Sequence, residues 1–179
     1  MSTLTHPWQI EALHFFDDGV TPNNRRLPLV IMRDTEAQES HDPAAWFETT
    51  FAAHGWSSSW RWTVYPYQHF HSTNHEVLGV SRGWAKLLLG GQFGLAVYVH
   101  VGDVIILPAG VGHRRLTSSE DFQVVGAYPR GEKPDLIRSC DEFLEAPRQR
   151  ILKVPLPAQD PVYGEGGPLC DSWSLARSF

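Results

Sequence analysis

Residues 69–76 read His-Phe-His-Ser-Thr-Asn-His-Glu and are followed, after six further residues, by Gly83. Because side chains two positions apart on a β-strand point to the same side, His69 and His71 would lie close enough to share one ion. Glu76 is five residues further along, so a turn and a second strand can return its carboxylate to that ion. The segment therefore predicts a metal site built from two neighbouring strands.

A second segment, residues 102–113, reads Gly-Asp-Val-Ile-Ile-Leu-Pro-Ala-Gly-Val-Gly-His. Residues 103–107 have the composition of a strand, and the Pro and Gly residues after them favour a sharp turn. That turn would place the final His at the start of the following strand. The two segments together predict four ligands for one metal ion: His69, His71, Glu76 and His113.

Three imidazoles and one carboxylate suit a borderline divalent metal ion. We expect iron, manganese, nickel, zinc or copper, and the choice among them depends on geometry and availability that a sequence does not contain. A His-x-His pair alone is more often a pair of solvated strand residues, and a Pro-x-Gly segment alone can be a simple hairpin turn. The metal prediction therefore depends on the two segments occurring together and in this order.

Taken together, the two segments resemble the two sequence motifs of the cupin superfamily. In the first motif, His-x-His is followed after three or four residues by Glu and after six more by Gly. In the second, Gly is followed after five residues by Pro-x-Gly and after two more by His. The positions that match are His69, His71, Glu76, Gly83, Gly102, Pro108, Gly110 and His113. The resemblance covers the middle third of the chain and implies an all-β, cupin-type double-stranded β-helix, which is a jelly-roll barrel.

The chain departs from the family pattern at two positions. Thr63 stands where cupins usually have Gly, and Thr117 stands where they usually have Asn. Both positions are structural in the family, so local turns are affected rather than the metal ligands. Residues 17–19 and 160–164 also resemble segments of a group of small, single-domain bacterial cupins of unassigned function.

The third ligand stays open between Glu76 and His75. Counting back from Gly83 favours Glu76, whereas His75 shares strand parity with the two preceding histidines. An intervening turn would break that parity. We therefore prefer Glu76 as the ligand and keep His75 as its alternative.

The length of 179 residues suits one domain that spans residues 1–179. We expect a barrel core at about residues 60–130, with N-terminal strands and a helix in residues 1–59. A C-terminal segment, residues 131–179, is rich in Pro and Gly in its second half and is expected to wrap the barrel.

Two helices are predicted outside the barrel core. The first begins at Asp42-Pro43 and ends at Gly55, because Asp caps helices, Pro fits their first turn and Gly often ends them. The second is a short C-terminal helix at residues 135–145.

The composition is that of a folded protein, with 42% hydrophobic residues, 20% charged residues and a formal net charge of −5. No run of Lys or Arg indicates a nucleic acid or a membrane as partner. Residues 1–11 lack the pattern of a secretory signal, and no apolar run approaches the ~20 residues of a membrane span. Cys140 and Cys170 are most simply free thiols. We expect a cytoplasmic protein, and the fold implies a homodimer.

The surroundings of the ligands indicate a small-molecule site. Strand alternation points Tyr67 and Arg82 into the barrel, so both are candidate pocket residues. Four protein ligands leave open positions on an octahedral metal, where catalytic metals bind water, oxygen or substrate. We expect a metal-dependent enzyme of dioxygenase type or of isomerase or lyase type that acts on a small organic molecule. The alternative is a non-catalytic module that binds or senses a small molecule in the same barrel.

Overall fold

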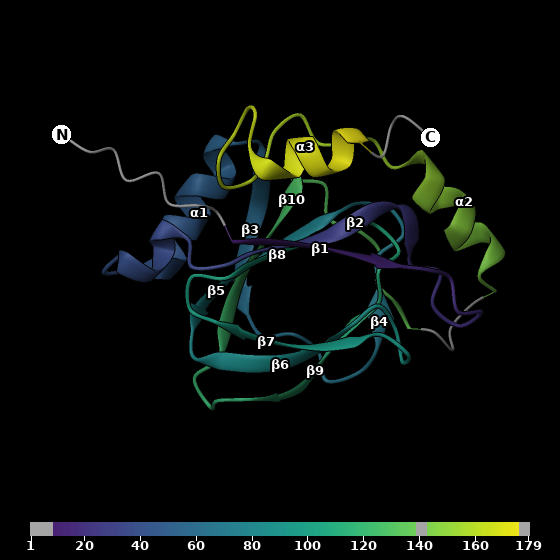
Figure 1. Ribbon diagram of the computed structural model, residues 1–179, viewed down its shortest axis with the longest axis horizontal. Coiled ribbons are helices and arrows are strands. Elements are labelled where there is room, and N and C mark those ends of the chain that lie inside the picture. The colour runs from purple at the N-terminus through teal and green to yellow at the C-terminus, as the bar shows by residue number, and fades with distance from the viewer. Residues whose placement is uncertain (1–8, 139–142, 176–179) are drawn as a thin grey trace.

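The computed structural model describes residues 9–138 and 143–175, and most of its secondary structure belongs to two antiparallel sheets (Figure 1). The larger sheet contains, in spatial order, β1 (Ile10–Phe15), β2 (Asn24–Met32), β8 (Val104–Leu107), β5 (Glu76–Arg82), β10 (Gln123–Pro129) and β3 (Trp56–Trp62). The smaller sheet contains β11 (Ile137–Arg138), β4 (His69–Phe70), β9 (His113–Ser118), β6 (Trp84–Leu89) and β7 (Leu95–His100).

The chain crosses repeatedly between the two sheets, which gives a cupin-type jelly-roll barrel and confirms the predicted fold class. The crossings occur at the two sequence motifs. The first motif runs from β4 in the smaller sheet to β5 in the larger sheet, and the second runs from β8 in the larger sheet to β9 in the smaller sheet. Because β4 pairs with β9 and β5 pairs with β8, both motifs meet at the same part of the barrel.

Two apolar cores lie on the two faces of the larger sheet. On β2, Leu29 and Ile31 belong to the core inside the barrel, whereas Val30 and Met32 belong to the core on the outer face. Side chains alternate along a strand, so a strand covered on both faces needs a continuous apolar run. The larger sheet is therefore a central layer, with the barrel interior on one side and helices on the other.

The helix α1 (Pro43–Ala53) covers part of the outer face, after a short 3-10 turn, η1 (Glu36–Glu39). The carboxylate of Asp42 caps α1 by accepting a hydrogen bond from a backbone N–H three residues on, at 3.1 Å. Phe47 of α1 is fully buried, and Gly79 of β5 leaves the space for its ring, since a Cβ there would lie 2.6 Å from it. The predicted N-terminal helix is thus confirmed.

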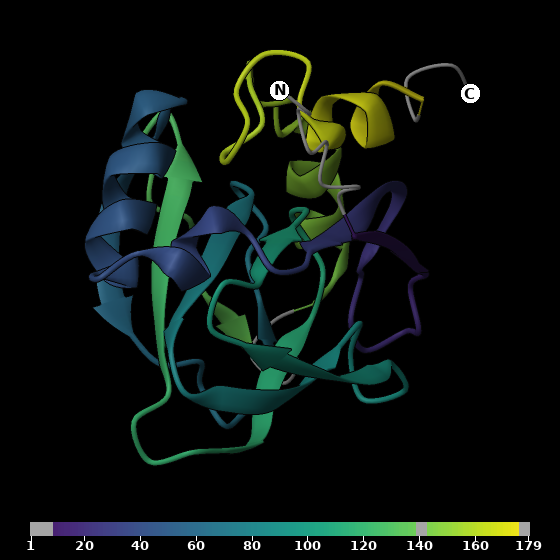
Figure 2. The same ribbon diagram turned by 60° about the vertical axis from the view of Figure 1, so that its left-hand side comes forward.

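Two more helices, α2 (Glu145–Lys153) and α3 (Pro168–Leu175), follow the barrel strands. The helix α3 packs on β2 and lies over the larger sheet in both views (Figure 1 and Figure 2). Trp173 of α3 is buried and donates its indole N–H to the carbonyl of Pro28 at 2.9 Å. The C-terminal segment therefore covers the outer face that α1 leaves open.

The predicted position of the C-terminal helix, residues 135–145, is wrong. Residues 137–138 are extended and pair with β4 as strand β11, and α2 begins only at Glu145. Residues 139–142, which include Cys140, lie outside the described residues. The reason is tertiary, because the carboxylate of Asp135 accepts hydrogen bonds from Ser72 and holds this stretch against the first motif.

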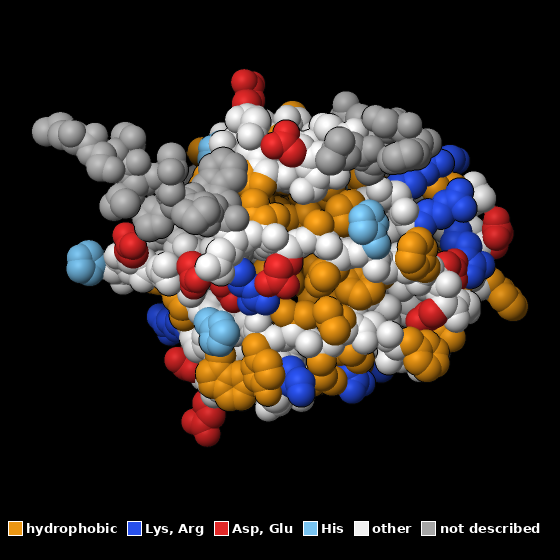
Figure 3. Space-filling view, viewed as in Figure 1, with side chains coloured by type: hydrophobic (Ala, Val, Ile, Leu, Met, Phe, Trp, Pro, Cys, Tyr) orange, Lys and Arg blue, Asp and Glu red, His pale blue; other side chains and the backbone are white. Residues whose placement is uncertain are grey.

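The smaller sheet ends at β7, which exposes apolar side chains. Leu95 and Tyr98 of β7 are 48% and 51% exposed, and Trp84 of β6 lies beside Tyr98. In Figure 3 hydrophobic side chains gather where Figure 1 places β6 and β7. The predicted homodimer is not tested by these observations and stays a prediction. Within the described part of the chain, no helix has the length and apolar character needed to span a membrane.

Candidate metal centre

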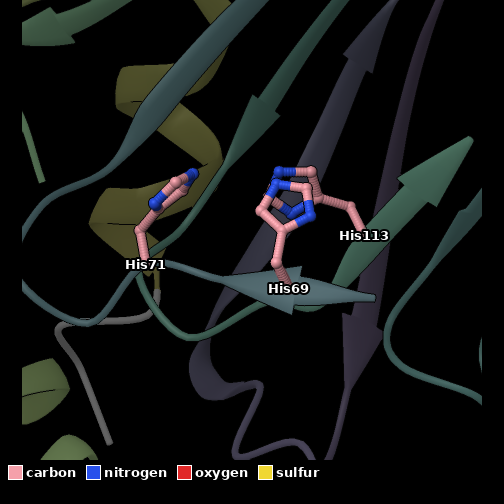
Figure 4. A group of neighbouring side chains, drawn as sticks. All are labelled: His69, His71 and His113. Carbon is pink, nitrogen blue, oxygen red and sulfur yellow. The ribbon is translucent and has the colours of Figure 1, made fainter. Parts of the chain in front are cut away.

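Three buried histidines meet inside the barrel. His69 lies on β4 directly opposite His113 at the start of β9, and His71 follows β4. One possible ligand atom from each residue lies within 4.8 Å of those of the other two. The rings of His69 and His113 lie close together, with centroids 4.1 Å apart, and His71 stands beside them (Figure 4).

The carboxylate of Glu76 reaches this cluster from the opposite sheet. Its Oε2 lies 3.3 Å from Nε2 of His71 and 3.4 Å from Nε2 of His113. Glu76 begins β5 and is buried, and the next inward residue of that strand, Leu78, is also buried. The fold thus brings together all four side chains that the two motifs single out.

Backbone carbonyls fix how the three histidines present their nitrogens. Nδ1 of His69 is 3.1 Å from the carbonyl of Tyr67, and Nδ1 of His113 is 3.0 Å from that of Val111. Nδ1 of His71 is 2.5 Å from the carbonyl of Asp135. A carbonyl oxygen only accepts, so each Nδ1 carries the proton. In the neutral ring Nε2 then has the lone pair that a metal ligand requires. Nε2 of His71 and Nε2 of His113 also face the carboxylate of Glu76, so a metal ion would displace any proton held between them.

His75 lies on the other side of the sheet. Its Nδ1 accepts the N–H of Ala109 at 2.9 Å, and its Nε2 donates to the carbonyl of Pro155 at 3.2 Å. The ring packs against Trp173 with a centroid distance of 4.8 Å. Burial lowers the pKa of His75 to about 4, so the ring is neutral. Both of its nitrogens already have backbone partners.

The charges inside the centre suit a cation. Burial lowers the pKa of His69 to about 2, which keeps that ring neutral. Burial also opposes charge on His71, but the nearby carboxylate raises the pKa of His71. Burial disfavours the ionised form of Glu76, yet His71 and His113 hold the pKa of Glu76 below its ordinary value. An ionised carboxylate among imidazoles is a donor set that fits a borderline divalent ion.

A cavity of about 270 Å³ opens beside these side chains. Besides the four residues of the centre, it is lined by Trp60, Trp62, Thr63, Val64, Tyr65, Leu78, Tyr128, Lys133, Pro134 and Leu136. The indole N–H of Trp60 donates to the Tyr128 hydroxyl at 2.7 Å. Burial, together with the carboxylate of Glu76, raises the pKa of Tyr128 above its ordinary value.

Sequence reasoning did not single out Trp60 and Tyr128. Both lie on strands of the larger sheet, Trp60 on β3 and Tyr128 on β10. Tyr128 has the same strand parity as the inward-facing Val124, which is the signal that could have found it. The signal is weak, because the pairing of β10 with β3 shifts register between Gly126 and Tyr128.

The two candidate pocket residues lie elsewhere. Tyr67 does not line the cavity; its ring stacks on Tyr65 and lies 4.1 Å from the guanidinium of Arg138. Arg82 is exposed at the end of β5, where the pairing with β10 shifts register. Alternation places Arg82 inward only if the strand stays regular, and the irregularity at its end removes that orientation.

A network of polar side chains holds His71 in position. The carboxylate of Asp135 accepts hydrogen bonds from the N–H of Ser72 at 2.6 Å and from the Ser72 hydroxyl at 2.5 Å. Arg150 of α2 donates to the same hydroxyl at 2.7 Å. These contacts hold the backbone carbonyl of Asp135 on Nδ1 of His71. The first motif is thereby tied to a segment more than sixty residues away.

The fold and the three-histidine cluster define a cupin-type barrel with a candidate metal centre. The chain is 39% identical over 165 residues to YjlB, an uncharacterised protein of Bacillus subtilis (strain 168). The match covers 92% of this chain and 97% of YjlB. The chain belongs to the same protein family as YjlB. No protein-family model matches it.

Solved structures give more distant likenesses. The coconut allergen cocosin has a TM-score of 0.39 and 16% identity, and the match covers 45% of this chain but only 23% of cocosin. Acireductone dioxygenase from Bacillus anthracis, solved with a cadmium ion in its active centre, has a TM-score of 0.35 and 20% identity, over 51% of this chain and 62% of the enzyme. These likenesses are too distant to assign a function to this chain.

Proposed function

We propose that this protein is a metal-dependent enzyme, which binds one divalent metal ion and acts on a small organic molecule. The ligands are His69, His71, Glu76 and His113. One observation carries this proposal: buried imidazoles and a carboxylate converge, and backbone carbonyls orient each imidazole with Nε2 toward the others.

A divalent ion bound there supplies a Lewis acid and, where the metal is iron or another redox-active ion, an electron carrier. Four protein ligands leave one or two positions open on an octahedral ion. The cavity is lined by the same four side chains, so a molecule held there would lie beside the ion, and the aromatic wall would exclude water from it. The residues of the chain itself bind and orient the substrate.

Tyr128 is placed to donate a hydrogen bond to the carboxylate of Glu76. Its hydroxyl accepts the indole N–H of Trp60, so its own proton is free to point toward Glu76. The raised pKa of Tyr128 keeps that proton on the phenol at neutral pH. In this arrangement Tyr128 holds the carboxylate in place rather than acting as a base.

The test is elemental analysis of untagged protein purified without added metal, with oxygen uptake measured on the same sample against small thiols, phenols and diketones. The proposal predicts about one metal ion per chain. Iron with oxygen uptake points to a dioxygenase, whereas zinc, nickel or manganese without uptake points to an isomerase or lyase. Protein that stays metal-free after reconstitution with each of the five metals would contradict the proposal and leave the non-catalytic binding module.

A further inference from the structure

The wall of the cavity beside the metal centre is mainly apolar. Trp60, Val64, Leu78 and Leu136 line it together with further aromatic residues. An apolar cavity of about 150 Å³ is large enough to take up benzene. A cavity of about 270 Å³ therefore suits a molecule built on a single ring or an apolar body of similar size.

One cationic side chain lines this wall. Lys133 is the only Lys or Arg among the described lining residues, and within the described part of the chain it forms no ion pair. Its acidic neighbours in sequence are engaged elsewhere, since Glu132 pairs with Arg130 at 3.4 Å and Asp135 lies 3.7 Å from Arg150. The ammonium of Lys133 is therefore available to a ligand.

A second polar group in the wall also lacks a partner. Thr63 lines the cavity, and its hydroxyl oxygen is buried with no hydrogen-bond partner among the described residues. Buried polar groups in proteins nearly always have a partner, so an unpaired one in a cavity wall points to a missing ligand or water. This position is one of the two at which the chain departs from the family sequence pattern.

The charge balance favours an anion once metal is bound. Metal ligation requires neutral imidazoles, so the charged groups of the lining are the Glu76 carboxylate and the Lys133 ammonium. With neutral imidazoles these two charges cancel, and the charge of the ion is then added to zero. A divalent ion leaves the lining with a net positive charge: the ion would lie among buried side chains, and the exposed Lys133 stands at the open side of the cavity, where an entering negative group would meet it.

We propose that the ligand of this cavity is a compact organic anion, with an apolar body about the size of one ring and a negative group that pairs with Lys133. This inference rests on the proposed function, because the ligand shares its cavity with the metal-binding side chains. Lys133 is then the residue that determines specificity for charge. The apolar wall determines specificity for size.

The experiment compares two probes of the same shape, 4-fluorobenzoate and 4-fluorobenzamide, which differ in charge. Binding to the full chain is measured by ¹⁹F NMR, with and without zinc, and the zinc content of each sample is measured separately. We expect the anion to bind about tenfold more tightly than the amide to the zinc-loaded protein. Lys133→Met should reduce that preference several-fold, because only the charge of the metal then remains, and Lys133→Arg should restore most of it.

Lys86→Met is the matched control, because Lys86 lies on the outer face of the smaller sheet over the ring of Tyr98. It removes one positive charge outside the cavity and should leave the preference unchanged. Equal binding of the two probes, no binding of either, or an unchanged preference in Lys133→Met would overturn the inference. Failure of the proposed function is a separate result, since it appears in the metal analysis as protein that binds none of the five metals, whatever the probes do.

Discussion

Buried histidines lie on both sides of the larger sheet, but their hydrogen bonds differ. On the outer face, His75 has a backbone partner at each ring nitrogen and packs against Trp173. On the inner side, within the barrel, His69, His71 and His113 come from the smaller sheet and the loop after β4, and each has a backbone partner only at Nδ1. Burial alone therefore does not identify a ligand. The position of the second nitrogen distinguishes a histidine that fills a core from one that can bind an ion.

The contrast is sharpest between consecutive residues. His75 and Glu76 are adjacent, and strand alternation sends them to opposite faces. The outer residue joins the apolar layer under α3, and the inner residue joins the three histidines. If the two faces are functionally separate, substitutions on the outer face should change stability without changing metal content, and substitutions on the inner face should do the reverse.

The largest effect on stability is expected from Phe47→Ala on the outer face. Phe47 is fully buried and stacks on Phe51, so its removal leaves a cavity in the outer core. We expect a loss of about 3–5 kcal/mol in the free energy of unfolding, measured by urea titration. The folded fraction should keep its full metal content. A metal-depleted but folded variant would show that the two faces are coupled.

A smaller loss is expected from Asp160→Asn, also on the outer side. The buried carboxylate accepts hydrogen bonds from the N–H groups of Val162, Tyr163 and Leu169 at 2.8 to 2.9 Å. An amide in its place offers one acceptor oxygen instead of two. Unfolding should become easier by about 1–3 kcal/mol, again with metal content unchanged. Unaltered stability would mean that these hydrogen bonds do not fix the C-terminal segment against the larger sheet.

On the inner side, Asp135→Asn tests how the centre is positioned. The substitution weakens the hydrogen bonds from Ser72 and the ionic contact with Arg150 that keep the Asp135 carbonyl on His71. Losses of this kind typically reduce metal affinity about tenfold, and we expect that change in a competition titration with a chelator. Glu132→Gln is the control, because its carboxylate is exposed and contacts Arg130 instead. Equal metal affinity in the two variants would show that Asp135 does not position the metal-binding side chains.

The smallest effect is expected from the exposed ion pair that joins α1 to β3. The hydrogen bond from Arg61 lowers the pKa of Glu48. The pair therefore stabilises the folded state above the ordinary carboxylate pKa, and this contribution is lost as the pH falls through the lowered value. Both side chains are partly exposed, so Glu48→Gln should shift the melting midpoint at neutral pH by no more than about two degrees. A larger shift, or one that persists at low pH, would contradict this assignment.

Much of the fold could be predicted because the local signals agreed. The strands β5, β8 and β9 and the helix α1 were readable from apolar runs, a capping Asp and terminal Gly residues. The four motif side chains could also be named, and the structure brings them together. Their role as metal ligands remains a prediction.

Other features depend on contacts that no local pattern contains. The stretch from Lys133 to Ile137 lies beside the first motif because Asp135 binds Ser72, a contact between segments 63 residues apart. Because of that contact, residues 137–138 form a strand where a helix was expected, and Lys133 lies at the cavity. Arg82 could not be placed either, because a register shift at the end of β5 is not visible in alternation.

The most direct test of the account is the metal content of three purified, folded variants, His71→Ala, His113→Ala and His75→Asn, each reconstituted with zinc under the same conditions. We expect His71→Ala and His113→Ala to bind about a tenth or less of the zinc bound by the unaltered protein. His75→Asn should bind about as much as the unaltered protein, although it unfolds more easily. Full zinc occupancy in His71→Ala and His113→Ala, or its loss in His75→Asn alone, would contradict the central claim that the metal centre lies on the inner face.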